Sequence, residues 1–485
     1  MSRHRDRPYR LGATDAPRIL SREECDAIAE RVFRFARGRG SDTRVGIFSW
    51  WQGEMRWGRN RVSLASDRRD LRIEIWRGSP FGSYGSATTN QVDDVSLEAA
   101  VRAAERELDL MEEDPPAAYL PPLPTLDVPK TAIWSDATVG LTTEARGEMA
   151  RALVDSAEGK GMLSAGYAEV RAAAKAVISS EIRAGRPAMF ETPYSAWTHA
   201  QCSMTVRDAT GTGSGWAGLS SYDWGKIDAP ALAERALDKC LRSRNPVGLE
   251  PGRYTVILEP QAVADLIEPL VYWLGARERA ESGNGPFVLG SDDALHITRT
   301  KLGLKVVDER ITISHDYADP ALGIVPEVGA GSAPVSWIDH GVLSALSYSR
   351  EYGLGMLGEQ YGLRGTTGYR MSGGESSIAE MIRTTKRGLL VTRLWNVGQF
   401  DESSVLCTGL TRDGLWLIEN GKITKPVKNF RFTESPLFVL NSIEALGTPV
   451  PVFRPTRSGS GELMPAIVPP LKARDFSFTS LVDAV

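Results

Sequence analysis

A turn-rich stretch near the middle of the sequence constrains the fold of this chain more than any other feature. Residues 245–252 begin with Asn-Pro and end with Pro-Gly, and they show neither helical nor strand periodicity, which is typical of a connection between domains. The chain has 485 residues, more than one hydrophobic core usually organises. We therefore expect a flexible tail over residues 1–18, an amino-terminal domain over residues 19–248 and a carboxy-terminal domain over residues 249–485.

The first half alternates helical and strand-like segments. Ser21 and Glu24 form a capping-box pattern ahead of apolar residues at helical spacing, so a helix is expected to begin after Ser21. Further helices are expected at residues 96–111, 142–159 and 230–242. Short runs of strand-forming residues occur at 44–51, 55–57, 61–65 and 71–77. Gly, Asn and Asp separate these runs, which favours an antiparallel meander.

Strand-like segments dominate the second half. They occur at residues 254–258, 304–307, 312–314, 388–395, 414–419 and 422–427. Asn420-Gly421 separates the last two and is a strong signal for a type I′ hairpin turn. Two helices are expected here, at residues 260–275 and 437–447. We predict an α+β fold with two domains: an amino-terminal α/β domain with a mainly antiparallel sheet, and a carboxy-terminal, mostly-β, barrel-like domain with a few helices.

Charge and hydropathy argue against several classes of partner. The net charge is -4 and the pI is about 5.9, so no global field favours nucleic acid or an anionic membrane. The start of the chain lacks the apolar segment of a signal peptide. The most apolar helical stretch, residues 262–276, is too short and too polar to span a bilayer. The four cysteines lie far apart without paired spacing, so we expect a protein of the reducing cytoplasm.

A glycine-rich stretch, Gly213 to Gly218, matches the pattern G-x-G-x-x-G. A dinucleotide site would need a helix to open directly after it, so that the helix amides meet the pyrophosphate. Here the following ten residues are polar and turn-like. We therefore expect a flexible glycine loop and no nucleotide site.

Histidines offer little metal chemistry. Five are present, at His4, His199, His296, His315 and His340, and no H-E-x-x-H occurs. His199 and Cys202 are three positions apart in a strand-like run, which places their side chains on opposite faces. His340 lies between Asp339 and Gly341, a pattern that indicates a hairpin turn.

Among these histidines, His315 has the most potential ligands close to it in sequence. Asp316 and Asp319 follow it in a turn, so one imidazole and two carboxylates stand close in sequence. This combination suits a metal or substrate contact. The alternative interpretation is a solvated strand end without a ligand.

The second half carries a family resemblance. Residues 386–392 read KRGLLVT, and residues 408–433 read TGLTRDGLWLIENGKITKPVKNFRFT; this strand and hairpin resemble the TldD/PmbA family closely. Residues 72–90, RIEIWRGSPFGSYGSATTN, resemble a strand and turn of the same family. The resemblance extends from about residue 20 to nearly the end of the chain, and it implies the two-domain fold predicted above.

Within this family the resemblance is to the PmbA (TldE) kind of subunit. TldD-like members carry H-E-x-x-x-H on the helix after the first strand of the carboxy-terminal domain, with a late cysteine as a further zinc ligand. Counting on from the strand at residues 256–258 places the three motif positions at Glu268, Pro269 and Trp273. None of these matches the motif, and no cysteine follows Cys407. The resemblance therefore implies no zinc in this chain and a zinc site in a TldD-like partner.

We expect from this a non-catalytic subunit of a heterodimeric metallopeptidase that degrades unfolded peptides or trims modified precursor peptides. An extended peptide would be selected by main-chain pairing rather than by sequence. The candidates for peptide contacts are Trp395, Asn396 and Asp401, in the loop expected after residue 393, together with His315. Their other interpretation is structural.

Two other functions stay open. The chain could be an active metallopeptidase with a metal site unlike that of the family, built on His315, Asp316 and Asp319. It could also be a peptide-binding module without protease activity.

Overall fold

The computed structural model describes most of the chain. The described residues are 19–36, 42–78, 84–110, 133–180, 192–275, 277–292, 297–324, 333–359, 362–363, 367–454 and 464–482. The predicted tail over residues 1–18 lies outside these ranges, as do His4 and His296.

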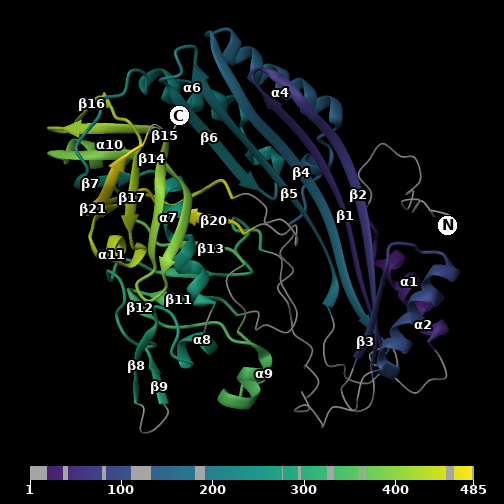
Figure 1. Ribbon diagram of the computed structural model, residues 1–485. Coiled ribbons are helices and arrows are strands. Elements are labelled where there is room, and N and C mark those ends of the chain that lie inside the picture. Colours follow the sequence, from purple (N-terminus) through teal and green to yellow (C-terminus); the bar gives the residue numbers. More distant parts are fainter. Residues whose placement is uncertain are drawn as a thin grey trace.

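The first half is built on a six-stranded antiparallel sheet in the order β3-β2-β1-β4-β5-β6. Figure 1 shows its long strands running side by side on one side of the molecule, with the second half on the other. The elements are α1 (Arg22–Phe35), β1 (Thr43–Gly58), β2 (Arg61–Gly78), β3 (Tyr84–Thr89), α2 (Asp94–Leu110), α3 (Asp136–Val139), α4 (Thr143–Glu158), β4 (Met162–Ser179), β5 (Thr192–Asp208), β6 (Ser214–Ser221), the 3₁₀ turn η1 (Trp224–Lys226) and α6 (Ala229–Arg242).

Helices cover one face of this sheet. Side chains alternate between the two faces along a strand, and one face of β1 presents Val45, Ile47, Trp51 and Met55. Helices α1 and α2 pack on the end that holds Val45 and Ile47. Helices α4 and α6 pack on the end that holds Trp51 and Met55. The predicted mainly antiparallel α/β arrangement is therefore confirmed.

Local signals placed the helices well and the strands less well. Ser21 and Glu24 form the predicted capping box at the start of α1. The four short strands expected between residues 44 and 77 are wrong in number, because they form two long strands, β1 and β2, paired along their whole length. Gly53 interrupts the pattern in sequence, but its missing Cβ leaves the space that the Arg146 guanidinium fills.

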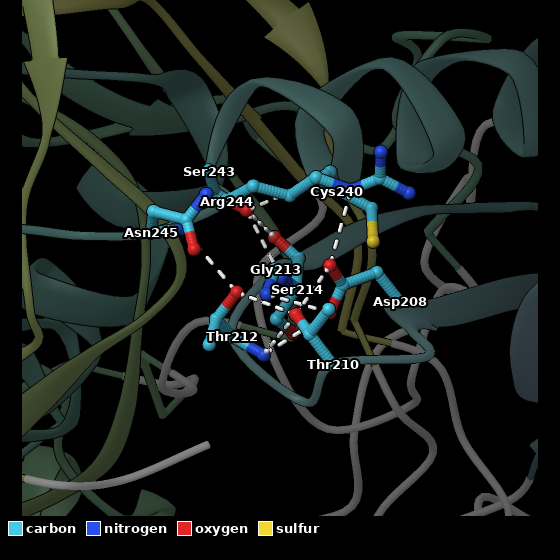
Figure 2. Close-up of polar contacts among 9 residues, drawn as sticks. All are labelled: Asp208, Thr210, Thr212, Gly213, Ser214, Cys240, Ser243, Arg244 and Asn245. Atoms are coloured by element: carbon cyan, nitrogen blue, oxygen red, sulfur yellow. Dashed lines mark hydrogen bonds and ion pairs between the residues drawn. The ribbon is translucent and has the colours of Figure 1, made fainter.

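The glycine-rich stretch is a strand and not a flexible loop, so that prediction was wrong. Residues 208–213 form a tight turn in which Asp208 Oδ1 accepts hydrogen bonds from the amides of Thr212 (3.0 Å) and Gly213 (2.9 Å) (Figure 2). Strand β6 then follows, and Ser243 at the end of α6 bonds to Ser214. A Cβ on Gly215 would lie 2.1 Å from the Ala236 carbonyl oxygen. These glycines therefore allow β6 to pack tightly on α6.

The opposite face of the sheet carries buried polar side chains. Glu169 accepts hydrogen bonds from Gln52 (2.8 Å) and Gln201 (3.1 Å), and it pairs with Arg171 at 2.7 Å. Burial raises the pKa of Glu169, although Arg171 acts in the opposite direction. Buried carboxylates need such partners because desolvation disfavours their charge.

The second half contains a closed, barrel-like sheet and a second sheet. Its elements are β7 (Gly252–Leu258), α7 (Pro260–Leu274), α8 (Arg277–Glu281), β8 (Val288–Asp292), β9 (Ile297–Thr300), β10 (Ile313–His315), β11 (Val335–Asp339), β12 (Val342–Leu343), α9 (Arg350–Tyr352), the π-helical turn η2 (Gly353–Leu357), β13 (Tyr369–Met371), α10 (Ile378–Arg383), β14 (Arg387–Asp401), β15 (Leu406–Glu419), β16 (Lys422–Pro426), β17 (Phe430–Glu434), α11 (Pro436–Asn441), β18 (Ile443–Leu446), β19 (Val450–Pro451), β20 (Ala466–Val468) and β21 (Leu471–Leu481).

Strand pairing closes the first of these sheets. Its order is β14-β7-β21-β17-β15, and β15 pairs back onto β14, while β16 and β18 attach outside this ring. The second sheet has the order β12-β11-β10-β13-β20-β19. One hydrophobic core joins side chains of α7, of the closed sheet and of the second sheet. The predicted mostly-β, barrel-like half with a few helices is therefore confirmed.

Two predicted hairpin turns are present, and one predicted helix is half wrong. Asn420 (φ 49°) and Gly421 (φ 78°) connect β15 to β16 in the left-handed conformation that a type I′ turn requires. His340 and Gly341 connect β11 to β12 in the same way. The helix expected over residues 437–447 ends at Asn441, and β18 follows because its residues pair with β21.

The predicted domain boundary at residues 248 and 249 falls between α6 and β7 and stays a prediction. Contacts cross it: Trp416 Nε1 donates to the Arg242 carbonyl oxygen at 3.2 Å, and Lys239 pairs with Glu259 at 2.5 Å. None of the helices in the described part of the chain is both long enough and apolar enough to cross a membrane.

The packing of β6 on α6 generates a prediction. In Gly215→Ala, the new Cβ would lie 2.1 Å from the Ala236 oxygen and 2.5 Å from the Cys240 nitrogen. Helix backbone cannot move aside locally, so we expect the free energy of unfolding to fall by about 1–3 kcal/mol. Thermal unfolding followed by circular dichroism measures this. Gly58→Ala is the control, because no atom lies within 4 Å of its added Cβ. An equal midpoint for both variants would contradict the tight packing.

Candidate functional site

Helix α7 directly follows β7 and is the most enclosed helix of the second half. Its buried residues are Ala262, Val263, Ala264, Leu266, Ile267, Leu270, Val271, Trp273 and Leu274. Gln261, Asp265, Glu268 and Tyr272 are spaced by four, three and four positions, which places them along one face of the helix. Polar residues on one face of an otherwise apolar helix mark the face that meets solvent or polar partners.

Arg454 neutralises the centre of this stripe. Its Nη2 lies 2.9 Å from Glu268 Oε1, and its Nη1 donates to Glu268 Oε2 at 3.3 Å. Arg454 is only 5% exposed. Such a bidentate, charge-assisted pair fixes both side chains in one geometry.

Asp265 lies one turn before Glu268 and ties α7 to its neighbours. Its carboxylate accepts hydrogen bonds from Gln261 Nε2 (2.8 Å) and from the Leu394 amide (3.1 Å). Removal from solvent raises the pKa of Asp265 to about 6, although Gln261 and the nearby Arg393 and Arg454 lower it. The carboxyl therefore titrates close to neutral pH.

Residues 452–454, here called the strap, lie against the stripe and connect β19 towards β20. The Gln261 side chain donates to the Phe453 carbonyl oxygen (3.2 Å) and accepts from the Phe453 amide (3.1 Å). Ser220 of β6 makes the same pair of bonds with the main chain of Arg454, at 3.1 Å and 3.0 Å. The strap is thus held between the first half of the chain and α7.

The three predicted motif positions lie on α7, and their side chains do not fit a zinc ion. Glu268 is committed to Arg454, Pro269 has no donor atom, and Trp273 donates its indole N–H to Gln399 Oε1 at 3.0 Å. Zinc requires lone pairs from three protein ligands and an open position. That these positions correspond to lost zinc ligands stays a prediction.

The candidates for peptide contacts are not in a loop, so that part of the prediction was wrong. Trp395, Asn396 and Asp401 all lie within β14, which continues through a β-bulge between Trp395 and Gly398. Asn396 takes a positive φ of 54° at this bulge, which explains why the sequence resembles a strand end. Strand pairing with β15 resumes beyond it.

These three residues have different surroundings. Trp395 is 44% exposed, and the Arg412 guanidinium lies 4.2 Å from its ring centroid. Asp401 accepts hydrogen bonds from the Ser403 hydroxyl and the Ser404 amide, and bonding from Ser404 lowers the pKa of Asp401. Asp401 therefore stabilises the turn at residues 401–404, while Trp395 presents an exposed aromatic surface.

His315 is buried, so its interpretation as a solvated strand end is wrong. It ends β10, as expected, but it is 2% exposed. Its ring packs edge-on against Tyr317 (4.9 Å between centroids) and Trp337 (5.5 Å). Burial lowers the pKa of His315, which favours the neutral imidazole.

The alternative metal site around His315 is not assembled among the described residues. Asp319 pairs with Arg370 at 2.5 Å, and Asp316 accepts from the Ala318 amide. Within the described ranges, no three His, Cys, Asp or Glu side chains are grouped to hold a metal ion.

His199 and Cys202 also stay apart. Both lie in β5, with Cys202 in the core under α4 and α6 and His199 on the opposite face. The expectation of opposite faces is therefore confirmed. All four cysteines are free and buried.

Of the most connected residues of the site, sequence reasoning named Glu268 and missed Gln261, Asp265 and Arg454. Gln261, Asp265 and Glu268 gave a usable signal, since polar residues at helical spacing interrupt an otherwise apolar helix. Arg454 gave none, because it is 186 residues from Glu268 along the chain.

The raised pKa of Asp265 predicts a pH dependence. The folded pKa of about 6 exceeds the unfolded value of about 3.9, so the extra stability is present below pH 4 and is lost as the pH rises through 6. Asp265→Asn removes this term. The unfolding free energy of the wild type relative to D265N should therefore fall between pH 4.5 and pH 7.5, by at most about 1.4 kcal/mol per pKa unit, reduced by partial exposure. Urea unfolding at both pH values measures it, and a pH-independent difference would contradict the assignment.

Comparisons with known proteins agree with this architecture. Residues 251–480 match the family model described as the PmbA/TldA metallopeptidase C-terminal domain. No curated protein matches the sequence.

Solved structures share the fold across nearly the whole chain. TldE from Thermococcus kodakarensis is 17% identical with a TM-score of 0.75, covering 93% of this chain and 100% of its own. A candidate modulator of a DNA gyrase from Thermotoga maritima is 16% identical with a TM-score of 0.75, covering 94% and 100%. A candidate modulator of DNA gyrase from Bacteroides thetaiotaomicron is 19% identical with a TM-score of 0.74, covering 95% and 100%.

At these identities the structures establish the fold, while the match over residues 251–480 establishes the relationship in sequence. The second half of the chain is therefore related to the PmbA/TldD family of metallopeptidases, and the chain as a whole shares the fold of the solved TldE structure.

Proposed function

We propose that this chain is a non-catalytic, zinc-less subunit of a TldD/TldE-type metallopeptidase heterodimer. The complex would act in the cytoplasm on unfolded peptides or on modified precursor peptides. One observation supports the proposal. On α7, the Glu268 carboxylate is occupied by its ion pair with Arg454, while Pro269 and Trp273 offer no lone pair for a metal. The TldD-like partner holds the zinc and performs the hydrolysis.

The contribution of this chain is a binding surface rather than a chemical step. Trp395 offers an exposed aromatic face held in place by Arg412. Its neighbour Asn396 is also exposed at the bulge of β14. Aromatic faces and exposed main chain at a bulge accept extended peptides without demanding a particular sequence. These contacts would form part of the wall that guides a peptide to the zinc of the partner.

A peptide-binding module without protease activity is the second candidate. The observation that favours it is the capture of the Phe453 main chain by the Gln261 side chain. The third candidate, an active enzyme built on His315, draws no support from its aromatic surroundings or from the pairing of Asp319 with Arg370.

Co-expression with a TldD-like partner tests the proposal. We expect the two chains to co-purify and to hydrolyse an unfolded peptide, whereas this chain alone does not. Replacing the motif glutamate of the partner by glutamine should reduce kcat at least about 100-fold, because general base catalysis is lost. Asp316→Asn in this chain should leave kcat within about twofold. Hydrolysis by the isolated chain, or loss of activity in D316N, would contradict the division of labour.

A further inference from the structure

We propose that the strap occupies, within the same chain, a binding site for an extended peptide that carries an aromatic residue followed by a basic one. This inference rests on the proposed function, since it names the peptide class and the regulation of that subunit's binding surface. Phe453 and Arg454 would be the resident occupants, and a substrate would have to displace them.

The Val452 amide of the strap donates to the Ala466 carbonyl oxygen of β20 at 3.2 Å, whereas the main chain of Phe453 and Arg454 is held by side chains. The Gln261 amide group both donates to and accepts from Phe453, and the Ser220 hydroxyl does the same for Arg454. A strand edge would offer the same donor and acceptor pairs to an incoming peptide. This arrangement therefore recognises any extended backbone that enters it.

An aromatic subsite receives the side chain of Phe453. The Phe453 ring packs edge-on against Tyr167 (6.1 Å between centroids, interplanar angle 77°) and against Trp216 (5.7 Å, 80°).

 Gly218 completes the subsite, because a Cβ there would lie 3.0 Å from Phe453 Cδ2. Edge-on aromatic contacts favour a planar ring over an aliphatic side chain.

A basic subsite follows directly. Glu268 binds the Arg454 guanidinium through both carboxylate oxygens, and Asp265 adds negative charge nearby. A lysine would make only one such bond, so arginine is the preferred residue. The acidic residue of this subsite, Glu268, lies on α7 at the first predicted motif position.

The strap has an entropic advantage over any free peptide, because it is part of the same chain as the site. A segment tethered within the same chain competes at an effective concentration in about the millimolar range. A peptide with the same two side chains is therefore excluded until the strap is weakened. This makes the strap an internal regulator of access to the site.

Peptide binding to the full-length chain tests this inference. The probe is a fluorescein-labelled, carboxy-amidated peptide with the sequence Pro-Val-Phe-Arg, which copies residues 451–454. We expect no binding to the wild type and saturable binding to the double variant Phe453→Ala, Arg454→Ala by fluorescence anisotropy. Peptides with Ala for Phe, or Glu for Arg, should bind at least about tenfold more weakly. The matched control is Arg431→Ala, Phe438→Ala, which removes an exposed pair elsewhere and should leave binding absent.

Reversing the charge of Glu268 tests the basic subsite directly. Adding Glu268→Arg to the double variant should make the peptide with Glu preferred over the peptide with Arg. A folded double variant that binds no peptide, or binds all of them equally, overturns the inference. A double variant that loses its folded circular dichroism signal also overturns it, since the strap is then part of the core. Co-purification with the TldD-like partner is measured separately, so the proposed function can stand when this inference fails.

Discussion

The enclosure of helix α7 governs the second half of the molecule. This helix shares one core with the closed sheet and with the second sheet, so a polar group on it loses water and must find a partner. Asp265 accepts hydrogen bonds from Gln261 and the Leu394 amide, and Glu268 forms an ion pair with Arg454. The centre of the polar stripe is thus held together by an arginine, whose charge is permanent and whose two nitrogens fit a carboxylate.

The same residues join the two halves of the chain. The strap reaches from the second half to Ser220 of β6, and its aromatic ring meets the polar face of the first sheet beside Tyr167. The tight packing of β6 on α6 fixes the position of Ser220 in turn. The geometry around Glu268 therefore depends on both halves, although the motif comparison concerns only the second.

Sequence reasoning succeeded where the signal is local. The capping box of Ser21 and Glu24 and the Asn420-Gly421 turn depend on a few neighbouring residues, and both are present. It failed where a distant partner decides the outcome. In the sequence, Gly215 resembles a loop residue, but in the structure it packs against Ala236. Asn396 likewise resembles a strand end, but β14 continues to pair with β15 beyond it. Pairs such as Arg454 and Glu268 have no local signature, because their spacing reflects the path of the chain through the whole fold.

Glu268 of α7 is paired with Arg454, and we propose that this helix does not bind zinc. The most direct measurement is elemental analysis of the purified wild-type chain, alone, after incubation with zinc and removal of the excess by gel filtration. We expect far less than one zinc per chain, both in the wild type and in Glu268→Gln. About one zinc per chain in the wild type, lost in Glu268→Gln, would contradict it.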